Sequence, residues 1–264
     1  MAAIAENRVT IDQVAYNLVP RENPTAQNGT AKQVHDFVTS AYGTWRITQL
    51  PWKIGDVVAE TATLAGMAKE SVQPLRDGVK VFKGAANGMI FGYWIWTMFE
   101  WDEQSSKVAA EGTGEQWVEL GRRSVDCVTA GCHSMATLVP SAKSTLGNVA
   151  LMTDLANDTI EACQAAVKWG RADELLTRCT NLSEDVQAGL QSEKTLHLIS
   201  LTKSVLAVVA GIFGLLGLLL GVAIVPSIVL LTLGLATCSL AFVKHFFKEN
   251  IPQFINREIA PIVV

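Results

Sequence analysis

The stretch GLLGLLLGVAIVPSIVLLTLG, from Gly214 to Gly234, contains no charge, no amide side chain and no histidine. It lies inside a longer run, from Ser204 to Val243, that lacks Asp, Glu, Lys, Arg, His, Asn and Gln altogether. A helix rises about 1.5 Å per residue and a bilayer core is about 30 Å thick, so about 20 residues cross it once. The run is about twice that length and can therefore form two membrane spans.

A proline divides this apolar run into two nearly equal halves. Pro226, with Ser227 beside it, removes a helix hydrogen bond and disfavours helix at the preceding residue. We therefore predict a transmembrane hairpin over residues 198–246. Lys203 precedes the run and Lys244 follows it, while the turn carries no charge. Because basic residues stay on the cytoplasmic side of a membrane, both ends of the hairpin and both termini are expected in the cytosol.

Small residues recur along both arms of the predicted hairpin. The glycines of the first arm fall within a sector of about 120° on one helix face, and small residues let membrane helices approach closely. We expect the two arms to pack on each other through this face. A dimerisation seam between two chains, which would make a homo-oligomer, is the alternative. The residues proposed for hairpin packing and the turn are Gly211, Gly214, Gly217, Gly221, Pro226 and Gly234.

The composition also points to a membrane. Hydrophobic residues make up 49% of the 264-residue chain and charged residues 17%, against about 25% charged residues in ordinary soluble domains. The net charge is -4 and no basic block occurs, which argues against nucleic-acid binding. The five cysteines have no disulfide-framework spacing and are expected to be reduced. The N-terminus shows no basic region followed by an apolar one, so no cleavable secretory signal is predicted.

Apolar spacing is helical along most of the chain, so the predicted fold class is all-α, with a helical bundle and a C-terminal two-helix transmembrane hairpin. Within residues 1–30 we expect a short helix, capped by Thr10 and stopped at Pro20, and then a polar linker. The bundle is expected over residues 31–197, with one helix ending before Pro51 and a polar break from Glu103 to Glu115. Residues 247–264 are expected to form an amphipathic tail on the membrane surface.

Residues 84–99, GAANGMIFGYWIWTMF, form a second apolar segment that is rich in aromatic side chains. The segment is shorter than the stretch of about 20 apolar residues that a membrane span needs. Three interpretations remain open for it: a core helix, an element at the membrane interface, or a short third span.

A heptad-like pattern of small and partly polar residues follows, with an interruption near Gly170. Small seam residues favour helices packed closely in a bundle over an isolated coiled coil. The predicted seam positions are Leu146, Val149, Thr153, Ala156, Ile160, Cys163, Val167, Leu175, Cys179, Leu182, Val186 and Gly189.

One cluster of residue types that serve in catalytic and metal sites is Cys127, Cys132 and His133. The paired acids Asp173-Glu174 and Glu184-Asp185 lie near arginines and are expected on solvated helix faces. A zinc site would need a second Cys/His group with matching spacing, and none is present. A cysteine nucleophile would need a residue that orients the histidine, and the sequence indicates none. No glycine-rich phosphate loop with its lysine occurs either. We therefore predict no catalytic residue, no cofactor and no metal, and do not expect an enzyme.

Two apolar lobes joined by a short turn, with a basic residue at each end, resemble the bilobed hydrophobic domain of chlamydial inclusion-membrane proteins. Lys203, Pro226 and Lys244 carry the resemblance, which covers residues 198–246 only. It implies type III secretion and insertion into a host-derived vacuole (inclusion) membrane. It also implies a helical region that faces the host cytosol and engages host proteins in a host–pathogen interaction.

The predicted function is that of an integral membrane protein in contact with the lipid bilayer. Its cytosol-facing helical domain would serve partner interaction or membrane organisation. A similar hairpin occurs in colicin-like pore-forming domains and in hairpin-anchored membrane-shaping proteins, and these two classes are the alternatives.

Overall fold

The computed structural model describes residues 8–11, 14–17, 30–111, 114–178 and 184–250, and confirms the all-α fold class. Seven α-helices, one 3-10 turn (η1) and one short β-hairpin make up these residues. Their bounds are β1 Arg8–Ile11, β2 Val14–Asn17, α1 Thr30–Thr39, α2 Ala41–Leu64, α3 Lys69–Glu111, α4 Gly114–Leu138, η1 Pro140–Ala142, α5 Lys143–Arg178, α6 Glu184–Leu220 and α7 Ser227–Asn250.

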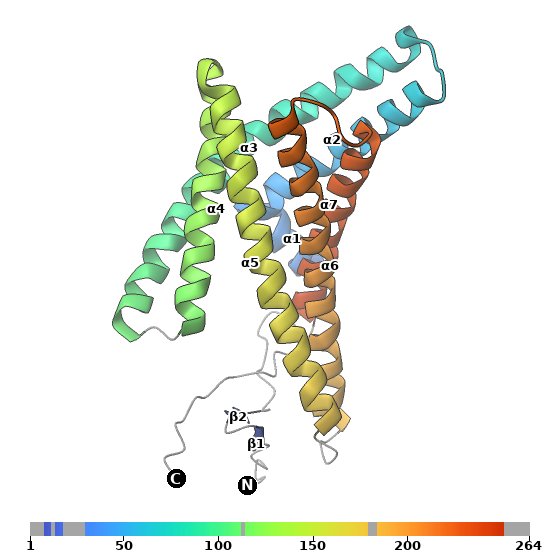
Figure 1. Ribbon diagram of the computed structural model, residues 1–264. Helices are drawn as coiled ribbons and strands as arrows, with labels where there is room; N and C mark the ends of the chain where they lie inside the picture. Colours follow the sequence, from blue (N-terminus) through green and yellow to red (C-terminus); the bar gives the residue numbers. More distant parts are fainter. Residues whose placement is uncertain (1–7, 12–13, 18–29, 112–113, 179–183, 251–264) are drawn as a thin grey trace.

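The six long helices pack in chain order, and the last of them returns to the first. Each helix from α2 to α7 packs against the next, and α7 also packs against α2. Figure 1 shows the α2–α3 end at the upper right, the α3–α4 end at the lower left and the α5–α6 end at the lower right. The apolar helices α6 and α7 lie between α5 and α2.

No break separates the expected bundle from the expected hairpin. α6 runs without interruption from Glu184 to Leu220, across the boundary predicted at residues 197 and 198. Its first half packs against α5, and its second half is the first arm of the hairpin. The hairpin is therefore rigidly continuous with a helix of the bundle.

The predicted short N-terminal helix is wrong. Residues 8–11 and 14–17 form an antiparallel hairpin, with Arg8 opposite Asn17 and Ile11 opposite Val14. Several of these residues are β-branched, which favours extended backbone over helix. The predicted linker and most of the amphipathic tail lie outside the described residues.

Two predicted helix breaks are absent or narrower than expected. α2 continues through Pro51. α5 is one helix through Gly170, where the heptad-like pattern is interrupted. Of the polar break expected from Glu103 to Glu115, residues 103–111 belong to α3 and residues 114–115 to α4, and the remainder lies outside the described residues. Proline and glycine disfavour helix locally, but this is a weak preference that tertiary context can override.

The heptad-like seam is only partly buried. Leu175 and Val186 lie in the core where α5 meets α6, as expected, with 1% and 2% exposure. Elsewhere along α5, however, Val149 and Val167 are exposed, and Ala150 and Ala165 are buried instead. The pattern of small residues did not distinguish the inner face of this helix from its outer face, because small and apolar residues occur on both faces.

Candidate membrane anchor and the ionic junction at its base

The C-terminal hairpin consists of two helices that are long and apolar enough to cross a membrane. They are Val186–Leu220 and Ser227–Phe247, with mean hydropathy 2.2 and 1.9 over their most apolar windows. Only 11% of the residues in each window are buried by the rest of the protein. A core hairpin of a soluble bundle would be covered on most sides, so this exposure is typical of helices that face lipid.

Gly221 and Pro226, two of the residues predicted for the turn, lie at its two ends. Gly221 ends the first arm with a φ of 65°, a left-handed conformation that glycine adopts without strain. Pro226 directly precedes α7, and its carbonyl oxygen accepts a hydrogen bond from the Val229 N–H at 3.0 Å. Proline fits the start of a helix because no helical partner is lost there.

The glycines of the hairpin do not pack arm on arm as expected. A Cβ added at Gly211 would lie 3.1 Å from a Leu155 methyl group of α5, and one at Gly214 would lie 3.4 Å from Leu151. On the second arm, Gly234 faces the Lys53 amine of α2, 3.2 Å from the position of a Cβ. Gly217 lies near the backbone of the turn. The face of α6 that carries Gly211 and Gly214 therefore packs against α5.

An ionic junction joins three helices at the base of the hairpin. The Lys203 Nζ of α6 donates to Glu161 of α5 at 2.7 Å, and the Lys244 Nζ of α7 donates to the same carboxylate at 2.5 Å. The Ser200 hydroxyl adds a third bond, at 3.3 Å. The Glu161 and Lys203 side chains are only 14% and 10% exposed. The two lysines that mark the ends of the apolar run in the sequence thus meet at one acid.

The two lysines of the ionic junction favour the ionised form of Glu161. Burial alone would raise the pKa of Glu161, but the ammonium groups of Lys203 and Lys244 hold it well below its ordinary value. Since two cations share one carboxylate, losing the carboxylate leaves a buried and a part-buried positive charge facing each other. Glu161 is therefore the residue on which the base of the hairpin depends, and the sequence contained no signal that paired it with either lysine.

α1 and α2 both pack against the second arm. At the base, the Phe37 ring of α1 packs on Phe242 and Phe246, with centroids 5.4 Å away in both cases. At the turn, the Ser227 hydroxyl donates to the Glu60 carboxylate of α2. The hairpin is thus flanked by α5 on one arm and by α2 on the other.

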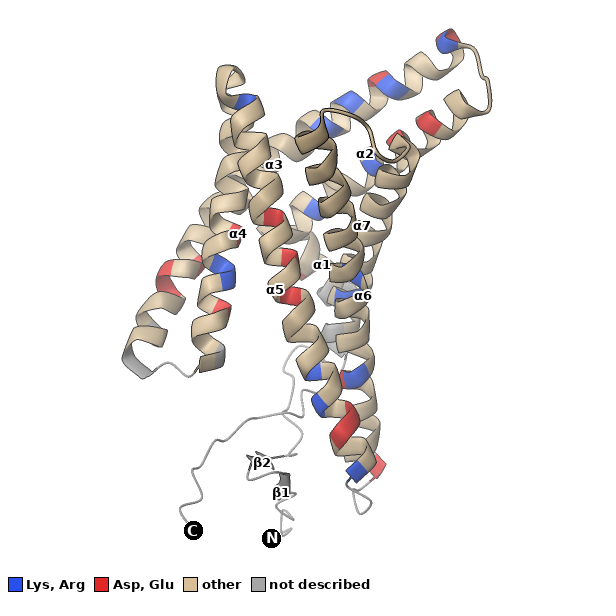
Figure 2. Cartoon of the chain, viewed as in Figure 1, with Lys and Arg blue, Asp and Glu red and all other residues tan. Residues whose placement is uncertain are grey.

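A second polar layer links α3, α4 and α5 beside the hairpin. The Tyr93 hydroxyl donates to Asp126 at 2.7 Å, and the His133 ring lies 3.1 Å from Asp154. Figure 2 shows coloured charged residues on the α2–α3 arm and at the lower ends of the helix pairs, whereas the upper part of α4 and α5 is almost entirely tan. The upper part of α4 and α5 therefore differs from the α2–α3 arm and from the lower ends of the helix pairs in carrying almost no charge.

The three residues considered for catalysis do not meet as a site. Cys127 and Cys132 are free thiols that line an apolar groove, while the His133 ring is bonded to Asp154 instead. Within the described part of the chain, no three His, Cys, Asp or Glu side chains gather as metal ligands would. In this structure the two cysteines therefore contribute to the groove lining, and His133 contributes to a pair with Asp154.

Comparison with known proteins adds no relative: no protein-family model, no curated protein and no solved structure matches the chain.

Proposed function

We propose that this chain is an integral membrane protein that is anchored by the α6–α7 hairpin and serves partner interaction or membrane organisation, without a catalytic step. The exposure of the hairpin carries the proposal. Leu219, Leu220 and Val222 at its tip are 68%, 64% and 60% exposed. At about 25 cal/mol per Å² of apolar surface, a hairpin left in water would cost tens of kcal/mol, whereas lipid removes that cost.

The same observation argues against the colicin-like alternative. A pore-forming domain that is soluble before insertion must wrap its hairpin with the other helices. Here α5 and α2 flank the hairpin, but its tip and much of its outer face lie open. A protein with this structure should need detergent or lipid from the start.

The part that would meet a partner is the α5–α6 stalk, which we define as residues 162–178 of α5 and 184–202 of α6. It extends past the ionic junction by about 25 Å along the helix axes. Leu175 and Leu190 form its core at 1% and 0% exposure, and the Lys194 amine donates to Asp173 at 2.6 Å. A rigid, charged stalk on the lysine-bearing side of the hairpin suits a cytosolic binding surface. The resemblance of the hairpin to inclusion-membrane proteins extends the proposal to a host-derived vacuole membrane.

The test uses the full chain in sealed vesicles, in a background that lacks the five native cysteines. Single cysteines at Gln187 in the stalk, at Glu249 after the hairpin and at Val222 at its tip are treated with a membrane-impermeant maleimide from the cytosolic side. We expect Gln187→Cys and Glu249→Cys to react, and Val222→Cys to react only after the membrane is permeabilised. The protein should also stay in the membrane after alkaline carbonate. Release by carbonate, or labelling of Val222→Cys from the cytosolic side, would refute the anchor.

A further inference from the structure

α5 is fastened to the first arm of the hairpin at three successive levels. Glu161 meets Lys203, Leu155 lies against Gly211 and Leu151 lies against Gly214. From the first to the last of these contacts, both helices advance by nearly the same number of residues, and both rise about 15 Å. The two helices therefore run antiparallel at equal depth from the ionic junction upward.

This register sets how far α5 and its neighbour α4 extend beside the hairpin. α5 begins at Lys143, and the first arm of the hairpin ends at Leu220. Measured from the ionic junction, each of these two helix ends lies about 26 Å away along its helix axis. The α4–α5 turn thus lies at about the depth of the hairpin turn, and Figure 1 shows both turns toward the same end of the molecule.

The α4–α5 segment at this depth is almost free of charge. Between Cys127 and Thr153, Lys143 at the turn is the one charged residue, and His133 is the one other ionisable group apart from the cysteine thiols. The His133 ring is bonded to Asp154, which joins the two helices to each other. Ionisable side chains inside a membrane pair with one another in this manner.

Five large apolar side chains of the same segment are exposed. We call this set the lateral surface: Val128, Met135, Leu138, Val149 and Met152, which are between 38% and 61% exposed. Surfaces of soluble bundles are polar on their outer faces, so this exposure needs a covering. An apolar partner is required over both helices.

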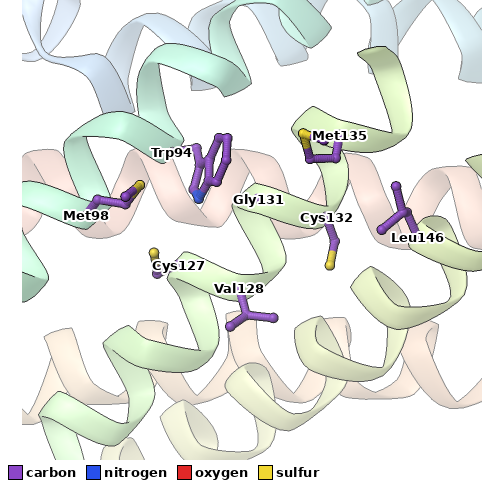
Figure 3. A pocket seen from close by; sticks show the side chains of 8 residues that line it. All are labelled: Trp94, Met98, Cys127, Val128, Gly131, Cys132, Met135 and Leu146. Atoms are coloured by element: carbon purple, nitrogen blue, oxygen red, sulfur yellow. The ribbon is translucent and has the colours of Figure 1, made fainter. Parts of the chain in front are cut away.

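The lateral surface continues into an apolar groove of about 320 Å³ between α3, α4 and α5. Figure 3 shows the Trp94 ring beside Gly131, with Met98 of α3 and Leu146 of α5 at the two ends of the groove. A Cβ at Gly131 would lie 2.9 Å from the Trp94 indole nitrogen, so α3 and α4 pack closely at its floor. The groove is lined almost wholly by apolar atoms, which suits a hydrocarbon chain and no polar ligand.

We infer that lipid hydrocarbon covers the lateral surface: α4 and α5 enter the bilayer beside α6 and α7 as a second hairpin, with Lys143 at the far headgroup level. The inference rests on the proposed membrane anchor, because the depth of α5 is measured from the hairpin to which it is fastened. It goes beyond that proposal, since a C-terminal anchor alone would leave α4 and α5 in water. The lateral surface belongs to helices that pack beside the exposed hairpin at the same depth, which favours lipid over a second copy of the chain as the covering.

The test places single nitroxide labels on the full chain in liposomes, in the cysteine-free background, and compares collisions with oxygen, which concentrates in hydrocarbon, and with a water-soluble nickel chelate. Val149 and Met152 report the lateral surface, Leu219 reports the anchor, and Lys168 in the stalk is the aqueous control on the same helix as the test positions. We expect Val149→Cys and Met152→Cys to match Leu219→Cys, with an oxygen-to-nickel collision ratio several-fold above that of Lys168→Cys.

Each other outcome overturns the inference in a distinguishable way. Nickel-dominated collisions at Val149 and Met152, with oxygen-dominated collisions at Leu219, would leave the anchor standing and place α4 and α5 in water. Protection of Val149 and Met152 from both reagents would show that protein, such as a second copy, covers the surface. Nickel-dominated collisions at Leu219 would refute the anchor and the inference together.

Discussion

Replacing Glu161 with glutamine should loosen the base of the hairpin more than any other single change of charge. Glutamine keeps the size of the side chain but removes the negative charge that two ammonium groups share. Lys203 donates to this carboxylate at 2.7 Å and Lys244 at 2.5 Å. In the variant, both lysines would face a neutral amide and each other.

The magnitude follows from how deeply the partners are buried. Removing one member of a buried pair costs about 3–5 kcal/mol, because a charge is left without compensation. Lys203 is 10% exposed, and the full effect applies to it, whereas Lys244 is 30% exposed and regains part of its hydration. The lower end of the range, about 3 kcal/mol, is therefore expected for Glu161→Gln.

The assay is the free energy of unfolding of the full chain in lipid–detergent micelles, measured by denaturant titration. The matched control is Glu174→Gln, which removes a carboxylate from an exposed pair with Arg178 on the same helix. Exposed pairs contribute about 0–1 kcal/mol, so the control should lose no more than that. Hydrogen exchange should also accelerate near Lys244 more than at the tip of α7.

Acid gives a second measurement of the same junction. The folded pKa of Glu161 lies below its ordinary value, which is about 4.3 when unfolded. The acid therefore contributes stability above that pH, and the contribution is lost as the pH falls further. The difference between wild type and Glu161→Gln should shrink below about pH 4. A loss equal to that of the Glu174→Gln control, or a difference that does not change with pH, would refute the reasoning.

Three further predictions concern packing, and all are checked by the same titration. Gly211→Val should destabilise the protein by about 1–3 kcal/mol, because the valine side chain would clash with Leu155 of α5. The control Gly147→Val places its side chain in open space and should cost less. Equal losses in the two variants would contradict the Gly211–Leu155 contact. Tyr93→Phe leaves the part-buried Asp126 without its donor and should cost about 1–3 kcal/mol, whereas a neutral effect would mean that the bond is replaced. Phe37→Ala empties a ring-packed site of 3% exposure and should cost about 3–5 kcal/mol, with faster hydrogen exchange at the base of α7 and unchanged exchange in the stalk.

The sequence by itself determined the features that depend on local composition. The run from Ser204 to Val243 has no charged or amide side chain and has Pro226 near its centre, which predicts two apolar helices and a turn. The structure has α6, α7 and a turn at Gly221. Hydropathy and backbone preference depend on residues that are close in sequence, so a window of about 20 residues is enough to predict an apolar helix. The all-α fold class follows from the same kind of local periodicity.

Local preference also explains where the sequence misled. The N-terminal β-hairpin forms between adjacent strands whose β-branched residues favour extended backbone, although the apolar spacing had predicted a helix. The helix through Pro51 shows that a local helix-breaking residue does not always end a helix. The seam of α5 was assigned to the core although Val149 is exposed. An uncharged helix face suits protein or lipid equally well, so periodicity alone does not tell them apart.

Only the tertiary structure decided which distant residues meet. Lys203 and Lys244 were identified as flanking charges, but their common partner is Glu161, 42 and 83 residues away. Gly211 was identified as a packing residue, but it packs against Leu155 of α5 instead of against α7. These pairings arise because the register between helices is chosen by the packing of whole faces, and no short stretch of sequence encodes it.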